Sequence, residues 1–205
     1  INFVSENGSD IFTAFTTRPD TIFGVTYIAI SISHDLATNL SKEDDKIKSF
    51  ITKYQKQKLS EETSAKVEKD GVFTGKYCLH PLTQKKIPIW IANYVLDNYG
   101  TGVVMGVPAH DPRDYEFAKK FDLEIIRVID NEKSINSLPN VEKGVLINSC
   151  EFNELQSDIA KEKITNHFQD YNLGEEVVTY RLRDWGISRQ RYWGCPIPVS
   201  YTHLR

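Results

Sequence analysis

The chain has 205 residues, of which 40% are hydrophobic, and its net charge at pH 7 is −3. This length allows one domain with a substantial core, or one domain with appendages. No apolar run approaches the roughly 20 residues that cross a bilayer, and no basic-then-apolar leader opens the sequence, so we expect no membrane span and a cytoplasmic location. The charge is not that of a basic nucleic-acid-binding protein, so any RNA contact must be small and local or depend on other parts of a larger protein.

The three cysteines lie far apart in the sequence, at Cys78, Cys150 and Cys195, with no C-x-x-C pair. An odd number of separated cysteines is unsuited to a disulfide framework. We therefore expect free thiols in a reducing compartment.

The first third of the chain predicts two strands and a helix. Residues 11–15 alternate in polarity and predict one strand, and residues 23–32, rich in Val, Thr, Tyr and Ile, predict a second. Residues 41–59 predict a surface helix that Ser41 can cap. Its apolar stripe consists of Ile47, Phe50, Ile51 and Tyr54.

The middle third returns to strand character in three short segments separated by turn-forming residues: residues 72–79, 86–92 and 102–107. A helix is expected to begin at Asp111, because Asp111 is a good N-cap and Pro112 suits the first helical position. Its core-facing positions are Phe117, Ala118 and Phe121.

The last third predicts strands at residues 124–130 and 145–148 and a helix over about residues 152–168, with Leu155, Ile159 and Ile164 facing inward. Many short strands with a few scattered helices favour an α+β fold. We expect a β-barrel-like core of short strands with peripheral helices.

Residues 16–21, Thr-Thr-Arg-Pro-Asp-Thr, are denser in functional groups than a connection requires. Three hydroxyls, a guanidinium and a carboxylate at a strand end can hold a phosphate, a ribose or an ester carbonyl. Pro-Asp is also ordinary turn chemistry, and composition alone favours a plain turn.

Residues 99–114 form a second such segment, in which a Gly-rich turn leads through a strand and a loop into a helix start. Backbone amides at that start can face a carbonyl oxygen or a phosphate. Capping can explain both Asp111 and Asp114, with His110 and Arg113 as surface residues, but a first-turn carboxylate beside a strand end, such as Asp114, can also receive a ligand ammonium group. No nucleophile completes a triad here, and the spacing of His110, Asp111 and Asp114 matches no strong metal motif.

Residues 181–194 interleave four arginines with three aromatic residues. This composition suits binding to phosphates and bases. It equally suits a segment that packs against another part of a protein, with its arginines paired to acids.

Three segments together resemble bacterial-type leucyl-tRNA synthetases, in order and at compatible separations: residues 15–27 (FTTRPDTIFGVTY), 87–114 (IPIWIANYVLDNYGTGVVMGVPAHDPRD) and 181–198 (RLRDWGISRQRYWGCPIP). Isoleucyl and valyl enzymes share a related insertion domain, but Asp20-Thr21 resembles the leucyl form. The synthetic HIGH-like and KMSKS-like motifs are missing, so the resemblance is to the connective insertion that edits. It implies an editing domain at residues 1–178, a segment leading back to the synthetic core at 179–199, and a tail outside the family pattern at 200–205.

The resemblance implies post-transfer editing, which is hydrolysis of the aminoacyl ester of mischarged tRNA(Leu), on the editing-domain fold of the class I Ile, Val and Leu synthetases. It implies no metal or organic cofactor, since ATP and Mg serve only the absent synthetic site. The expected partners are the 3′ end of charged tRNA(Leu) and the rest of the synthetase, in a monomeric enzyme.

The resemblance also assigns site residues. Asp114 is similar to the carboxylate that holds the substrate α-ammonium, and Thr21 to the residue that obstructs the leucine side chain. Thr16 and Thr17, which we group with Asp114 as catalytic, and Arg18 resemble the wall beside the ester and the terminal adenosine. The remaining residues resemble pocket-lining or substrate-binding positions: Tyr99, Met105, Val107, His110, Asp111 and Arg113. Water attack is expected to depend on positioning and oxyanion stabilisation.

Two other classes of protein remain open at this point. One is an RNA-binding module that presents the tRNA end without chemistry. The other is a small-molecule hydrolase, which needs a nucleophile that the sequence does not reveal.

Overall fold

A computed structural model describes residues 1–55, 68–96, 100–131 and 138–178. The expected site residue Tyr99, the end of the helix expected to reach Leu59, and the Arg- and Trp-rich segment all lie outside the described residues.

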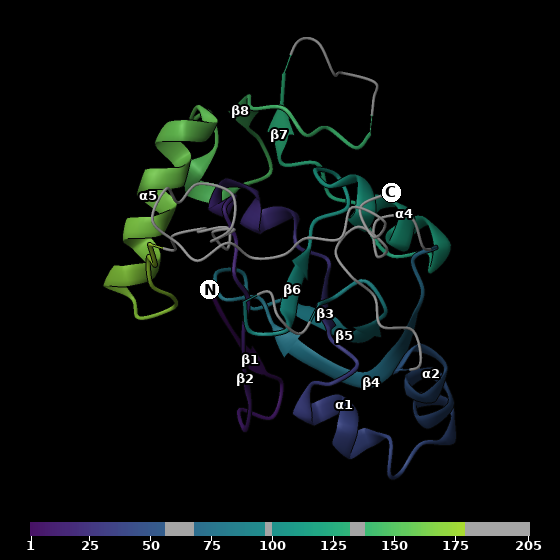
Figure 1. The fold of residues 1–205 in the computed structure, drawn as a ribbon. Helices are drawn as coiled ribbons and strands as arrows, with labels where there is room; N and C mark the ends of the chain where they lie inside the picture. The colour runs from purple at the N-terminus through teal and green to yellow at the C-terminus, as the bar shows by residue number, and fades with distance from the viewer. Residues whose placement is uncertain (56–67, 97–99, 132–137, 179–205) are drawn as a thin grey trace, which may run out of the picture.

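The core is a six-stranded mixed sheet in the order β2-β1-β4-β5-β3-β6, in which only β3 and β5 run parallel. The sheet curls into a nearly closed barrel with helices around it (Figure 1), which confirms the predicted α+β barrel class. Near the opening, the Thr101 hydroxyl donates to the Thr13 carbonyl, so the segment before β6 contacts the end of β2. The strands are β1 (Asn2–Ser5), β2 (Ile11–Thr13), β3 (Tyr27–Ile30), β4 (Gly71–Leu79), β5 (Lys86–Ala92) and β6 (Val103–Gly106).

Strand β3 is buried on both faces and separates two hydrophobic clusters. Ile28 and Ile30 belong to the main core inside the barrel, whereas Tyr27 and Ala29 face a second cluster with Phe117. This division follows from the two-residue periodicity of a strand. The second cluster anchors helix α4 (Pro112–Lys120) on the outside of the sheet, and α4 carries part of the site described below.

The N-terminal helices differ from the expectation at their starts. The predicted single helix from Ser41 is two helices, α1 (Asp35–Leu40) and α2 (Asp45–Gln55). Ser41 is the C-cap of α1, and Asp44 instead accepts from the amides of the first turn of α2. The predicted apolar stripe is confirmed, because Ile47, Ile51 and Tyr54 are buried and Phe50 packs partly against the core.

The strand expected from residue 23 begins only at Tyr27, because Pro19–Gly24 forms a 3-10 helix, η1. Strand β1 was not predicted. The strands expected at residues 124–130 and 145–148 shorten to a two-stranded pair, β7 (Ile129–Asp130) and β8 (Val145–Leu146).

The last helix begins later than expected. Cys150–Phe152 forms a short 3-10 helix, η2, and α5 spans Ser157–Asp170. Ile159 is 50% exposed, so its expected inward position is wrong. The buried face of α5 is instead formed by Ser157, Ala160, Ile164 and Phe168.

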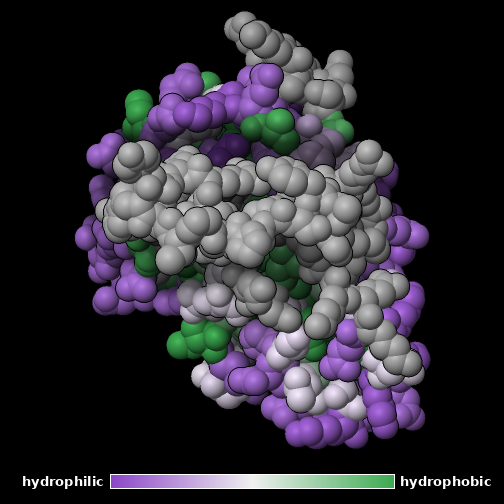
Figure 2. Space-filling view, viewed as in Figure 1, coloured by the Kyte–Doolittle hydropathy of each residue, from purple (hydrophilic) through white to green (hydrophobic). Residues whose placement is uncertain are grey.

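Hydrophilic side chains cover most of the outline of the molecule, and hydrophobic ones are confined to smaller patches (Figure 2). Among the described residues, no helix combines the length and the apolar character needed to cross a bilayer.

Candidate functional site

A cavity of about 630 Å³ lies where η1, the end of β6 and the first turn of α4 meet. These elements carry the two segments that the sequence singled out. The cavity is lined by Phe15, Thr16, Thr17, Arg18, Thr21, Lys69, Tyr94, Val95, Leu96, Val104, Met105, Val107, His110, Asp111, Pro112, Arg113, Asp114 and Glu116.

The threonine-rich segment forms a tight turn into η1, with Pro19 at the first helical position. The Thr16 hydroxyl accepts from the Arg18 amide at 2.9 Å, and the Thr21 hydroxyl donates to the Arg18 carbonyl at 2.9 Å. Thr21 is only 3% exposed. The segment is therefore both the turn that its composition favours and one wall of the cavity.

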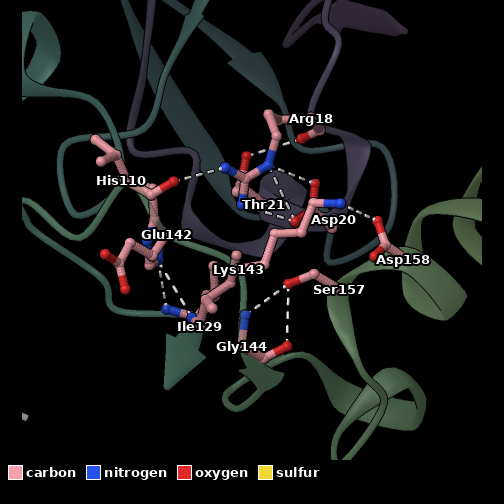
Figure 3. Close-up of polar contacts among 12 residues, drawn as sticks. Arg18, Asp20, Thr21, His110, Ile129, Glu142, Lys143, Gly144, Ser157 and Asp158 are labelled. Atoms are coloured by element: carbon pink, nitrogen blue, oxygen red, sulfur yellow. Dashed lines mark hydrogen bonds and ion pairs between the residues drawn. The ribbon is translucent and has the colours of Figure 1, made fainter. Parts of the chain in front are cut away.

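The Arg18 guanidinium is fixed by its neighbours, as Figure 3 shows. It pairs with the buried Asp20 carboxylate at 2.8 Å and donates to the Val141 carbonyl at 3.2 Å. These contacts hold a partly exposed cation in the cavity wall beside Thr21.

The start of α4 confirms the predicted cap. The Asp111 carboxylate accepts from the amides of Arg113 at 2.8 Å and Asp114 at 3.2 Å. These two amides are therefore occupied, and the expectation that amides of this first turn face a substrate oxygen does not hold for them.

Asp114 is the most deeply buried ionisable group in the cavity wall, at 2% exposure. Its Oδ2 accepts from the Val107 amide at 2.9 Å and its Oδ1 from Arg113 Nε at 3.3 Å. Burial raises the pKa of Asp114 to about 6, although the Arg113 guanidinium favours the charged form. A carboxylate has about four lone-pair sites, so these contacts leave room for a further donor.

Two buried tyrosines, Tyr27 and Tyr94, lie next to the part of the cavity wall that contains Asp114 and Arg113. The hydroxyls of Tyr27 and Tyr94 lie 2.7 Å apart, and the Arg113 guanidinium lies over the Tyr94 ring at 5.0 Å. A Cβ on Gly106 would lie 2.2 Å from the Tyr27 ring, so only glycine fits there. Burial raises the pKa of both hydroxyls, which are neutral near pH 7.

His110 lines the cavity, but backbone groups contact both of its ring nitrogens. Nδ1 lies 2.8 Å from the Asn140 carbonyl, and Nε2 accepts from the amides of Val128 at 3.0 Å and Ile129 at 3.2 Å. These partners select the neutral ring protonated at Nδ1, and burial lowers its pKa. The ring therefore connects the loop after β6 with the start of β7 and with Asn140, and it is not placed to act as a general base.

Apart from Tyr99, every residue that the sequence assigned to the site lines this one cavity. Sequence reasoning missed eight lining residues. Tyr94, Val95 and Leu96 follow β5 within the family-like segment, whereas nothing in the local sequence marks Lys69. Within the part of the chain that the structure describes, no cluster of three or more His, Cys, Asp or Glu side chains is arranged to hold a metal ion.

The fold and the cavity define a barrel domain with a ligand-sized pocket beside the end of β6, lined by both polar and apolar side chains. Residues 1–169 match the family model described as leucyl-tRNA synthetase, editing domain, and the chain belongs to this family.

Curated relatives agree with that membership. Leucine–tRNA ligase of Ruthia magnifica subsp. Calyptogena magnifica is 48% identical over 199 residues, covering 97% of this chain and 24% of that protein. The enzyme of Shewanella sp. strain MR-4 is 50% identical over 196 residues, covering 94% and 23%. The chain thus spans about a quarter of the length of these relatives.

A solved structure with the same fold is the ternary complex of Agrobacterium radiobacter K84 agnB2 LeuRS with tRNA and LeuAMS. It superposes with a TM-score of 0.67 at 35% sequence identity, covering 97% of this chain and 22% of that one.

Proposed function

We propose that this chain edits, by hydrolysing the aminoacyl ester of mischarged tRNA(Leu) in its cavity. The observation that carries the proposal is the juxtaposition of a buried carboxylate, Asp114, with the hydroxyl-bearing turn at residues 16–21 in one cavity. The family membership and the tRNA-bound relative support it.

Asp114 supplies the anchor for the substrate. Every aminoacyl ester carries an α-ammonium group, and a buried carboxylate pairs with it strongly because few other groups compete for the charge. The Val107 amide fixes the position of the carboxylate. The pairing of Asp114 with the ammonium holds any aminoacyl group and therefore does not select among aminoacyl groups.

Thr21 supplies the selection. A synthetic pocket distinguishes side chains that differ by one methylene by only about 1–3 kcal/mol, so a second site is needed to remove close analogues such as norvaline. Thr21 is buried, and its hydroxyl is bonded to Arg18, so it presents a fixed volume to the cavity. A branched leucyl group is excluded by that volume, whereas an unbranched one fits.

Water attacks the ester carbonyl, and the residues of this chain position the reactants. His110 is a structural ring, so we assign it no proton transfer. The Thr16 hydroxyl accepts from Arg18, and its own O–H remains a donor. Together with Thr17 it forms the wall at which the developing oxyanion is stabilised.

The wider context is part of the same proposal. The chain works within a monomeric cytoplasmic leucyl-tRNA synthetase, receives the 3′ end of charged tRNA(Leu), and needs no metal or organic cofactor for hydrolysis. ATP and Mg belong to the synthetic site elsewhere in the enzyme.

The test is a deacylation assay with norvalyl-tRNA(Leu) and leucyl-tRNA(Leu), using this chain and the full-length ligase. We expect hydrolysis of the norvalyl ester only, and its loss in Asp114→Asn. This variant keeps the size of the side chain and removes its charge, and a cooperative thermal unfolding transition will show that the fold is intact. Binding of tRNA without any hydrolysis by the wild-type protein would favour the RNA-binding module instead.

A further inference from the structure

The Arg113 guanidinium contacts both Asp114 and the ring of Tyr94. Its Nε donates to Asp114 Oδ1 at 3.3 Å, and its central carbon lies over the Tyr94 ring, 5.0 Å from the ring centre. A guanidinium over an aromatic face is attracted by the negative charge of the π system. Tyr94 and Asp114, from different segments of the chain, therefore hold the same cation.

The Tyr94 ring is itself fixed by two other elements of the fold. Tyr94 follows β5 and is only 4% exposed. Its hydroxyl shares a hydrogen bond of 2.7 Å with Tyr27 of β3, and its ring meets the edge of Phe117 of α4 with centroids 5.5 Å apart. Tyr27 in turn is fully buried and stacks on Phe117 at 5.0 Å. The ring is thus a rigid surface beneath the cation.

Arg113 needs such a surface, because 39% of its side chain is exposed. A long, partly exposed side chain loses conformational freedom when it is held in an ion pair, so a contact with one carboxylate contributes little by itself. A packed aromatic ring restricts the side chain to the position in which it meets Asp114.

We propose that Tyr94 is a positioning residue of the editing site: its ring holds the Arg113 guanidinium at Asp114 and so fixes the carboxylate that receives the substrate ammonium. This inference rests on the proposed editing function and adds to it a residue that acts through another. It also gives Arg113 a role within the protein, beside the substrate contact that the resemblance implied.

The measurable consequence concerns the charge of Asp114. Arg113 favours its charged form and Asp111 disfavours it. The hydroxyls of Tyr27 and Tyr94 lie close enough to be affected by Asp114, but they are neutral near pH 7. Without the Tyr94 ring, the guanidinium is held less firmly near the carboxylate, so the pKa of Asp114 should rise above its value of about 6.

The first test measures the pKa of Asp114 in the ligand-free chain by NMR titration of its carboxyl carbon, which does not depend on hydrolysis. Tyr94→Leu should raise this pKa by about 0.5, as expected for the loss of one cation–π contact. Arg113→Gln should raise it by about 1 or more. An unchanged titration of Asp114 in Tyr94→Leu would overturn the proposal.

The second test asks whether Tyr94 acts through Arg113. In the double variant Tyr94→Leu/Arg113→Gln, the pKa of Asp114 should equal that in Arg113→Gln alone, because the cation on which the ring acts is already absent. If the leucine changes the pKa further in this background, Tyr94 acts by filling space or excluding water, and the proposal is wrong.

Two controls separate the ring from its surroundings. Tyr94→Phe keeps the aromatic face and should retain the wild-type titration, although the urea midpoint should fall because the buried Tyr27 hydroxyl loses its partner. Phe121→Leu loosens the same hydrophobic cluster through Phe117, at a residue that is not among those lining the cavity, and should leave the titration unchanged. A shift in either control as large as that in Tyr94→Leu would contradict the proposal.

The third test connects this contact with editing. In deacylation of norvalyl-tRNA(Leu), the acid limb of the kcat/KM profile should move to higher pH in Tyr94→Leu by the same amount as the pKa measured by NMR. A shifted pKa with an unmoved acid limb would count against Asp114 as the anchor, and so against the proposed function, whereas the contact between Tyr94, Arg113 and Asp114 would stand.

Discussion

At the scale of single residues, we propose that Thr21 and Asp114 divide the work of the cavity between selection and anchoring. Thr21 is buried and tied to the Arg18 carbonyl, so its volume is fixed. Asp114 is a buried carboxylate that accepts from the Val107 amide and from Arg113 Nε. Each role leads to a separate experiment, because one concerns size and the other charge.

Thr21→Ala should allow the site to hydrolyse leucyl-tRNA(Leu). Removing the hydroxyl and methyl groups opens space for the branched side chain, and we expect the leucyl deacylation rate to rise at least tenfold, in line with the energy of one or two methylenes. Norvalyl-tRNA(Leu) is the internal control and should be hydrolysed at close to the wild-type rate. An active variant that still spares the leucyl ester would disprove the steric role.

Asp114 should make deacylation depend on pH in the acid range. Its pKa of about 6 means that it loses its charge, and its attraction for ammonium, as pH falls through that value. The kcat/KM profile reports groups of the free enzyme, so we expect it to decline below about pH 6 after subtraction of spontaneous hydrolysis. A flat profile from about pH 5 to about pH 7 would mean that Asp114 is not the anchor.

At the scale of elements, the start of α4 positions the site. The Asp111 carboxylate caps the helix, and the first turn beyond it places Asp114 against the Val107 amide at the end of β6. One strand end and one helix start are thereby joined through the residue that we assign to the ammonium.

Asp111→Ala should therefore weaken both the helix and the site. Loss of an N-cap typically costs about 1 kcal/mol, measurable as a lower urea midpoint. We also expect a reduced norvalyl deacylation rate, because Asp114 loses its fixed position, whereas Asp111→Asn should restore most of both. A normal midpoint in Asp111→Ala would show that the cap contributes little to this helix.

A helix or strand could be predicted from the sequence where the residues that mark its ends lie within or next to it. Strands β4, β5 and β6 and the start of α4 were predicted within a residue or two, because turn residues bound them and Asp111-Pro112 marks the helix start. The turn at residues 16–21 was indicated by Pro-Asp, but the 3-10 helix η1 that follows from it was missed because its Thr, Ile and Phe residues favour strands.

At the scale of the whole molecule, two buried neutral histidines connect distant segments. His80 Nε2 lies 3.0 Å from the Ile22 carbonyl, and its Nδ1 accepts from two amides of the following turn. His110 connects the loop after β6 to β7 and to Asn140. Burial lowers the pKa of both rings.

These rings should make the fold sensitive to acid. A histidine with a lowered folded-state pKa binds fewer protons in the folded than in the unfolded state, so its contribution to stability is lost as pH falls below about 6.5. Asp114, whose folded pKa is raised, acts in the opposite direction. We therefore expect the urea midpoint to drop between about pH 7 and about pH 5, and to drop more steeply in Asp114→Asn. A shallower dependence in that variant would contradict this assignment.

The composition of the site was predictable from the sequence only where residues cluster in one segment. The turn at residues 16–21 and the stretch before Asp114 carry dense local signals, and the barrel brings them to one cavity. Lys69 and Tyr94 were not predicted as site residues, because both lie outside these two segments and only the fold brings them to the cavity. A single lysine beside Glu68 and Asp70 looks like a solvated surface group until the fold is known.

The most direct test of the central claim is the structure of this chain bound to a non-hydrolysable amide analogue of norvalyl-adenosine. We predict that the ligand ammonium lies within hydrogen-bond distance of the Asp114 carboxylate and that the norvalyl side chain contacts Thr21. A ligand bound outside this cavity, or bound inside it with its ammonium away from Asp114, would contradict the account.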